Sequence, residues 1–111
     1  MDIKAIQKMQ TQFSESRGWF FHKAENKDDL IKKLEYMAVA ICGEVGEFAN
    51  LVKKVLRQNE RLDNEMEDHL KEEITDVFIY CLLTASLLKM DLEKEYLKKL
   101  ERNKGRFQEK K

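Results

Sequence analysis

Two rows of residues, spaced at intervals of three and four, have apolar ends and acidic centres. Residues spaced in this way share one face of a helix. The first row carries Glu44 and Glu47, and the second carries Glu73 and Asp76. Carboxylates bind hard cations and also act as general acids and bases. We therefore take these four residues as the candidates for metal binding and catalysis.

The two acidic rows need a counter-charge if they face each other. At an effective dielectric constant of about 20, each pair of like charges about 4 Å apart costs roughly 4 kcal/mol. A hard divalent cation with water completing its octahedron suits an all-carboxylate set of donors. The rows therefore predict a site for Mg²⁺, with Mn²⁺ as the other possible cation.

Two other interpretations of the acidic rows stay open. The four carboxylates can instead form ion pairs with lysines and arginines of neighbouring helices, as most surface acids do. A di-iron centre is disfavoured, because that design uses Glu-x-x-His on two helices, whereas Glu47 and Asp76 stand at the partner positions here.

Glycines flank the first acidic row. Gly43 and Gly46 lie on either side of Glu44 inside a helical pattern, and glycine there costs about 1 kcal/mol relative to alanine. We expect a close approach of another backbone at the carboxylate site.

Apolar periodicity predicts four helices to position these residues. The ranges are about 2–17, about 28–57, about 66–89, and a last one from about residue 91, for which Asp91 is the candidate N-cap. An aromatic loop at 18–27 and a polar loop at 58–68 separate the first three. The stretch after Asp76 is apolar nearly all round, so three neighbouring helices cannot cover it. We expect a homo-oligomer.

Composition agrees with a helical protein. The 111 residues contain no proline and four glycines, which is too little turn chemistry for a β-rich fold. We predict an all-α fold, a four-helix bundle forming one domain over residues 1–111. Cys42 and Cys81 lie in apolar helical runs, and we expect both to be buried and reduced.

Charge and hydropathy exclude several classes of partner. With 21 basic and 21 acidic residues, the chain has no overall attraction to nucleic acid or to anionic membranes. The longest apolar run, from Val77 to Leu83, is far too short to span a bilayer, and no secretory signal is visible. We expect a soluble cytoplasmic protein that binds neither a nucleic acid polymer nor a membrane.

At this point the motifs resemble a known family. The sequence GEVGEF at 43–48, followed by EEITDVFIY at 72–80, is similar to the ExxE and ExxD signature of MazG-like nucleoside triphosphate pyrophosphohydrolases. The segment 91–107 resembles the closing helix of that family. The segments RGW at 17–19 and FH at 21–22 look like the nucleotide-side loop of its small, dCTP-pyrophosphatase-like members.

The resemblance implies an all-α homodimer or homotetramer. It also implies Mg²⁺-dependent cleavage of an NTP or dNTP to the monophosphate and pyrophosphate, in a role that clears unwanted nucleotides. The metal ligands that it carries over are Glu44, Glu47, Glu73 and Asp76. The alternative from another functional class is a non-catalytic helical module for oligomerisation or protein interaction.

The resemblance also guides the choice of substrate-binding residues. In the last helix we expect Lys99 and Arg106 to contact phosphates and Asn103 to donate an amide hydrogen bond. Trp19 is the candidate for stacking on the base. Tyr80 and His22 complete the expected substrate-binding set. The sequence leaves open the preferred base and sugar, and which carboxylate acts as the base.

Overall fold

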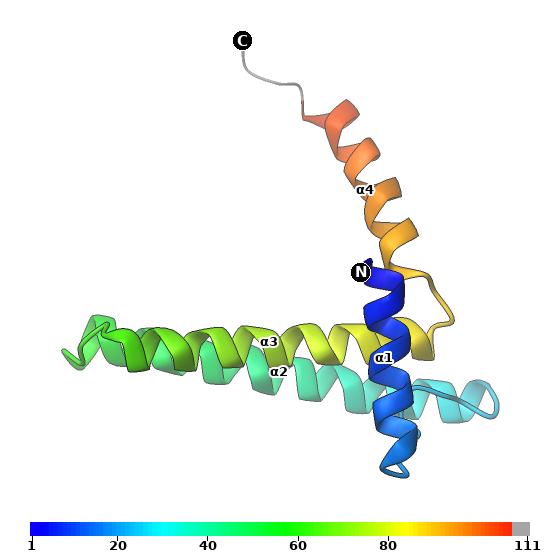
Figure 1. The fold of residues 1–111 in the computed structure, drawn as a ribbon, viewed down its shortest axis with the longest axis horizontal. Helices are drawn as coiled ribbons and strands as arrows, with labels where there is room; N and C mark the ends of the chain where they lie inside the picture. Colours follow the sequence, from blue (N-terminus) through cyan, green and yellow to red (C-terminus); the bar gives the residue numbers. More distant parts are fainter. Residues whose placement is uncertain (108–111) are drawn as a thin grey trace.

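The protein is all-helical over residues 1–107, the part of the chain that the computed structural model describes. No strand is present in that part, as the sequence predicts. Figure 1 shows the four helices in chain order, which are α1 (Ile3–Ser16), α2 (Lys27–Arg57), α3 (Asn64–Leu87) and α4 (Leu92–Arg106).

Each helix begins at a short acidic or amide side chain that caps it. Asp2, Asn26, Asp63 and Asp91 each accept a hydrogen bond from the backbone N–H three residues further on, at 2.8–3.2 Å. Such a cap contributes about 1 kcal/mol. Asp91 is the predicted cap of α4. The cap at Asp63 starts α3 at Asn64, a little before the predicted start, so the polar loop is shorter than we expected.

The helices α2 and α3 form a long antiparallel hairpin that carries most of the packing (Figure 1). Helix α1 crosses α3 near the end of the hairpin, and α4 packs against α1 and then extends away from the other helices. A single chain therefore forms the four predicted helices without closing them into a compact bundle. The two long helices can align their acidic rows, whereas α4 stays apart.

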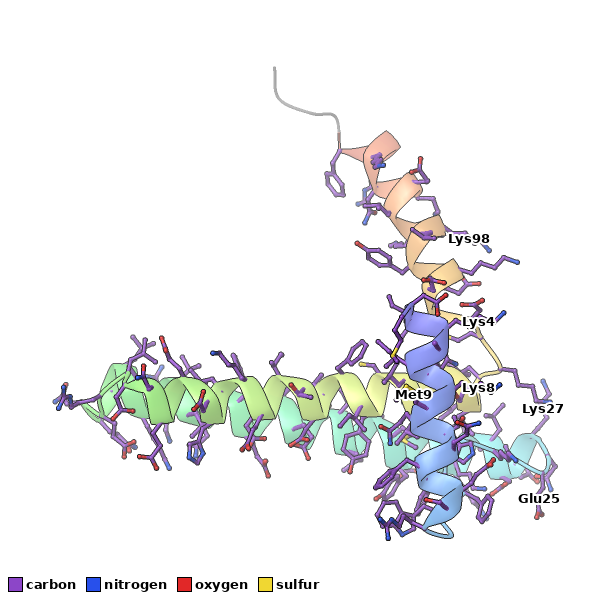
Figure 2. The ribbon with its side chains drawn as sticks, in the orientation of Figure 1. Lys4, Lys8, Met9, Glu25, Lys27 and Lys98 are labelled. Atoms are coloured by element: carbon purple, nitrogen blue, oxygen red, sulfur yellow. The ribbon has the colours of Figure 1, made fainter. Side chains whose placement is uncertain are left out.

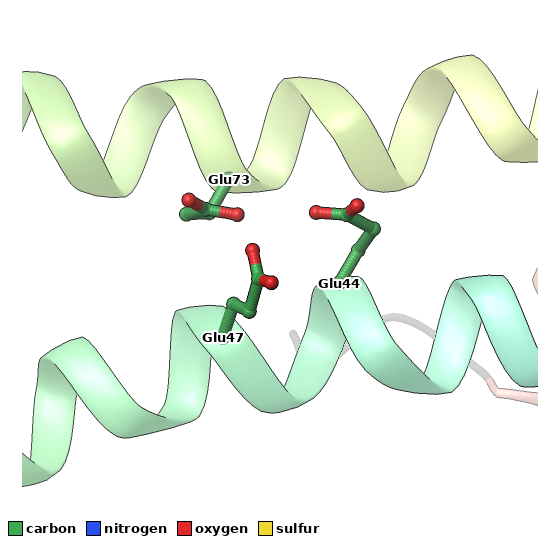
Figure 3. A group of neighbouring side chains, drawn as sticks. All are labelled: Glu44, Glu47 and Glu73. Atoms are coloured by element: carbon green, nitrogen blue, oxygen red, sulfur yellow. The ribbon is translucent and has the colours of Figure 1, made fainter.

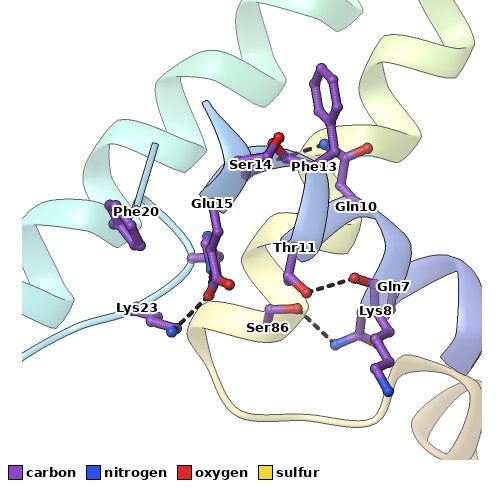
Figure 4. A network of polar contacts seen from close by, with 12 residues as sticks. Gln7, Lys8, Gln10, Thr11, Phe13, Ser14, Glu15, Phe20, Lys23 and Ser86 are labelled. Atoms are coloured by element: carbon purple, nitrogen blue, oxygen red, sulfur yellow. Dashed lines mark hydrogen bonds and ion pairs between the residues drawn. The ribbon is translucent and has the colours of Figure 1, made fainter. Parts of the chain in front are cut away.

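Gln7 of α1 fixes the point from which α4 departs. Its amide Nε2 donates to Ser86 Oγ and to the Met90 carbonyl oxygen, each at 3.0 Å, and its Oε1 accepts from the Leu92 N–H. Figure 4 shows the bond between Gln7 and Ser86. One side chain thus joins α1, α3 and the start of α4.

The core of the single chain is small. Met37, Leu82, Ala85 and Leu87 are its buried apolar residues. Many larger apolar side chains remain exposed on α2, α3 and α4, among them Val39, Ile74, Phe78, Tyr96 and Leu97. In Figure 2 side chains project freely along both sides of the hairpin and from α4, where Lys98 is labelled.

Two expectations about burial were wrong for the single chain. Both cysteines are free, but Cys42 is exposed and Cys81 is only half-buried. A Cβ at Gly43 or at Gly46 would meet no atom within 4 Å, so no other backbone among residues 1–107 approaches them closely. This face of α2 is open, which explains the exposure of Cys42 and the space around the two glycines. Among residues 1–107, no helix combines the length and the apolar character needed to cross a bilayer.

Candidate functional site

Three of the four candidate carboxylates converge between α2 and α3. Glu44 and Glu47 point from α2 toward α3, and Glu73 points back from α3 (Figure 3). One carboxylate oxygen from each lies within 4.8 Å of the other two. The convergence follows from the helical spacing of the acidic rows, since each row runs along the contact between two antiparallel helices. We call these three residues the carboxylate cluster.

The carboxylate cluster is electrostatically crowded. The pKa of Glu73 is raised from its ordinary 4.5 to about 7, first by its hydrogen bond with Glu47, and then by burial and by the neighbouring charges of Glu47 and Glu44. Without a cation, the cluster reduces its repulsion by keeping a proton on Glu73. The three groups together therefore favour any ligand that brings positive charge.

The cluster also has unused oxygen acceptors. Oε2 of Glu44 and Oε2 of Glu73 are buried and lack a hydrogen-bond partner within residues 1–107. Unpartnered oxygens in buried positions are unfavourable, and a cation would satisfy them. The donor set is entirely carboxylate, which fits Mg²⁺ or Mn²⁺ and offers nothing specific to softer metals.

The ion-pair interpretation receives no support from the described chain. The ion pairs among residues 1–107 lie in α1 and the following loop, in the first turns of α2 and α3, and along α4. Within residues 1–107 none of them includes Glu44, Glu47, Glu73 or Asp76. The acidic residues at the centre of the hairpin thus lack a basic partner in this part of the chain.

Asp76 lies beside the carboxylate cluster and is not part of its closest group. It lines a cavity of about 510 Å³ together with Glu44. Its charge and that of Glu44 are among the causes that raise the pKa of Tyr80 above its ordinary value, after burial and Tyr36. The tyrosine hydroxyl therefore stays protonated as a donor facing this acidic region.

Aromatic and aliphatic residues form most of the lining of the cavity next to the carboxylates. Its size is within the usual range for small-molecule sites. The rings of Phe21 and Tyr36 stack with centroids 4.6 Å apart, and Phe13 meets Trp19 edge to face at 6.1 Å. All four of these rings line the cavity, and so do Tyr80 and the polar residues Gln10, Ser14 and His22.

The aromatic loop is held against the cavity by the end of α1. Gly18 has a φ of +76°, a left-handed conformation that suits glycine. The Gly18 N–H bonds to the Glu15 carbonyl oxygen and the Trp19 N–H to the Ser14 carbonyl oxygen, which together end the helix. This turn directs Trp19 back over Phe13. The sequence shows the glycine, but the position of the ring depends on the turn.

His22 is 3% exposed, and it makes one polar contact through its ring. Its Nε2 lies 3.0 Å from Glu15 Oε1, while its Nδ1 is buried without a partner in the described residues. Lys23 Nζ contacts the same Glu15 oxygen at 2.7 Å (Figure 4). His22, Trp19 and Tyr80 are thus the expected substrate-binding residues that the fold brings to one cavity.

The three candidate residues of α4 do not reach this cavity. Lys99 and Arg106 are exposed and Asn103 is half-buried, on a helix that packs against α1. None of them is among the residues that line the cavity. Within a single chain, the expected phosphate contacts and the carboxylate cluster are therefore separate.

Sequence reasoning missed several residues of the cavity. Tyr36 precedes Glu44 by about two helical turns, a spacing that could have indicated it. Phe21 belongs to the FH segment that resembles the family's nucleotide-side loop, although it was not assigned to the site. Gln10, Phe13 and Ser14 lie on α1, and no motif in the sequence assigns them to the site. Glu15 was also missed, since it acts through its contact with His22.

Comparison with known proteins identifies the family of the chain. A family model described as the MazG nucleotide pyrophosphohydrolase domain matches residues 32–107. Among curated proteins, the Gene 37 protein of Mycobacterium phage L5 is 37% identical over 82 residues, which are 70% of this chain and 72% of the phage protein. The chain belongs to the MazG nucleotide pyrophosphohydrolase family, as its motifs predict.

Proposed function

We propose that the protein is a divalent-metal-dependent hydrolase that converts an NTP or dNTP to the monophosphate and pyrophosphate. The observation that carries this proposal is the carboxylate cluster, which lies beside an aromatic cavity and has buried, unpartnered oxygens. Membership of the MazG family supports the reaction class. We also propose a role in clearing unwanted nucleotides from the cytoplasm.

The metal ligands in this proposal are Glu44, Glu47 and Glu73, with Asp76 at the edge of the site. Mg²⁺ is the expected ion and Mn²⁺ the substitute. When bound, the ion would neutralise the triphosphate and favour ionisation of a water molecule. The carboxylates keep that charge fixed at the wall of the cavity, where positioning and electrostatics provide most of the catalysis of phosphoryl transfer.

The proposed reaction is attack of water on the α-phosphorus, with departure of pyrophosphate. The new bond joins the water oxygen to the α-phosphorus, and the bond to the bridging oxygen of the β-phosphate breaks. Glu47 is the exposed member of the cluster, so solvent reaches it most easily. We assign it to take the proton of the attacking water.

The nucleoside occupies the aromatic cavity in this proposal. Trp19 provides an exposed ring for stacking on the base, and Tyr80 donates its hydroxyl to the base or the sugar. His22 contacts the base. A base bound among these rings would exclude water from one side of the site, which would strengthen the electrostatic interactions at the carboxylates.

Self-association is part of the proposal. The triphosphate needs the basic side chains of α4, and within one chain these lie apart from the carboxylates. Val39 and Phe78 expose apolar surface on the hairpin, and the α2 face at Gly43 and Gly46 is open. A second copy packed on this hairpin would cover that surface. We propose a homodimer or homotetramer in which Lys99, Asn103 and Arg106 of one copy contact the phosphates held by the carboxylates of another.

Pyrophosphate release from a panel of standard and modified NTPs and dNTPs tests the proposal. We expect release with MgCl₂ and none with EDTA. Glu44→Gln should lower turnover by about 1000-fold, because it removes a charged ligand from the transition-state environment. Glu72→Gln is the matched control, since Glu72 is exposed beside Glu73 and should keep wild-type turnover.

The same assay distinguishes the alternative class. A non-catalytic helical module predicts no release from any nucleotide and no change in melting temperature on addition of MgCl₂, because only a ligand of the native state raises it. That combined result would refute the proposed hydrolase.

A further inference from the structure

The ion pair beside the cavity, formed by Glu15 and Lys23, is not used by the proposed chemistry. Glu15 lies in the last turn of α1, just before the aromatic loop, and its side chain is partly exposed. Its Oε1 is shared by Lys23 Nζ at 2.7 Å and His22 Nε2 at 3.0 Å. Because Lys23 stabilises the ionised form of the Glu15 carboxylate, this ion pair can determine which ring nitrogen of His22 carries the hydrogen.

The contact determines which ring nitrogen of a neutral His22 carries the hydrogen. An ionised carboxylate only accepts hydrogen bonds. Hydrogen bonds from Lys23 and then from His22 are the main causes that lower the pKa of Glu15, so this group is ionised at neutral pH. Nε2 must therefore donate, and in neutral imidazole the other nitrogen, Nδ1, then presents a lone pair.

The lone pair of Nδ1 has no partner in the described chain. Nδ1 is buried, and the imidazole as a whole is 97% buried while lining the cavity. Buried polar atoms in folded proteins are nearly always paired. A ligand that reaches this acceptor from the cavity must therefore bring a hydrogen-bond donor.

We propose that Glu15 is a positioning residue that fixes His22 as a hydrogen-bond acceptor and so selects nucleotides whose base presents an amino group. This inference rests on the proposed function and names the substrate class of the same site. Cytosine and adenine carry an exocyclic amino group where uracil and hypoxanthine carry a carbonyl oxygen. That oxygen would face the lone pair of Nδ1 without a hydrogen between them.

The first test measures the tautomer without using activity. The ¹⁵N chemical shifts of the ring nitrogens distinguish a protonated nitrogen from a bare one. The chain has two histidines, and His69, the second, lies 4.0 Å from Glu65 on an exposed part of α3. At pH 8 we expect His22 with a protonated Nε2 and a bare Nδ1. A bare Nε2, or two protonated nitrogens, would overturn the proposal.

The second test compares paired substrates that differ in one group. In the wild type, kcat/KM for dCTP should exceed that for dUTP by about tenfold, and dATP should exceed dITP similarly, because a lost hydrogen bond of this kind changes binding by about that factor. Glu15→Gln retains the shape but can donate as well as accept. We expect it to populate both tautomers and to bring the ratio close to one.

Glu65→Gln is the matched control for this substitution. It makes the same change in the other histidine–glutamate pair, away from the cavity, and should preserve both the His22 spectrum and the substrate ratio. Equal rates for the paired substrates in the wild type, or a ratio unchanged in Glu15→Gln, would overturn the proposal. Absence of hydrolysis of all nucleotides would instead refute the proposed function, while the spectrum still tests the tautomer.

Discussion

The centre of the α2–α3 hairpin and helix α4 carry the two halves of one expected site, and the fold treats them differently. Glu44, Glu47 and Glu73 come together within one chain, whereas Lys99 and Arg106 stay on a helix that extends away. The acids converge because they lie on two helices that are paired along their length. The basic residues lie on a helix that has its main contact with α1. The comparison teaches that the pairing of two helices brings the acidic half together within one chain, whereas the basic half joins it only if the proposed self-association holds.

The largest effects on activity should come from removing the basic side chains of α4. The same variants test whether the acidic and basic halves of a site come from different chains. Lys99→Ala and Arg106→Ala should each lower kcat/KM by about 100-fold, since each removes a charge-assisted bond to phosphate. If α4 of one chain completes the site of another, mixing Glu44→Gln chains with Arg106→Ala chains restores intact sites. Such a site combines the intact carboxylates of one variant with the intact α4 of the other. For random pairs, about a quarter of the wild-type activity should return.

The mixing experiment needs a matched control. Lys98 is exposed next to Lys99 and contacts Glu95 on its own helix, so Lys98→Ala should have little effect on kcat/KM. The two inactive variants are refolded together, and exchange is verified by mass. No recovered activity in a verified mixture would show that α4 does not act between copies.

A smaller effect concerns stability in the absence of metal. The folded chain holds a proton on Glu73 up to pH about 7, whereas the unfolded chain releases it near 4.5. The contribution of this proton to the free energy of unfolding is fully present below about pH 4.5 and is lost as the pH rises toward 7. The reason is that the folded state binds more protons than the unfolded state between these two pH values. In EDTA, the melting temperature should therefore fall by a few degrees between pH 5 and pH 8.

Glu73→Gln should make that decline shallower, because its amide cannot ionise. Glu72→Gln should leave the decline as it is in the wild type, since Glu72 is exposed to solvent. Thermal melts in EDTA across this pH range measure the difference. Identical slopes in the wild type and in Glu73→Gln would contradict the electrostatic account of the carboxylate cluster.

The sequence predicts those parts of the molecule that depend on local chemistry and helical period. The caps and the spacing of apolar residues define four helices, and the acidic rows identify the carboxylates that meet. Asp76 shows the limit of this reasoning. It follows Glu73 by three residues, which places the two about 60° apart around the helix. The same spacing separates Glu44 and Glu47, which both reach the carboxylate cluster, so helical period alone does not say which residues of an acidic row meet.

Other features of the molecule depend on contacts that the sequence pattern does not contain. The positions of Trp19 and His22 depend on the turn at Gly18 and on contacts made by α1, which no periodicity encodes. Cys42 and Gly43 lie on a face of α2 that the chain itself leaves open. An apolar row in the sequence indicates that a surface is to be covered, but it does not say whether the same chain covers it.

The most direct test of the central claim is the binding of MnCl₂ alone, followed by the electron paramagnetic resonance of free Mn²⁺. The wild type and Glu72→Gln should bind the ion equally, whereas Glu44→Gln and Glu73→Gln should each weaken binding by at least about tenfold, since each removes a charged oxygen ligand. Unchanged binding in both ligand variants would contradict the assignment of the carboxylate cluster as the metal site.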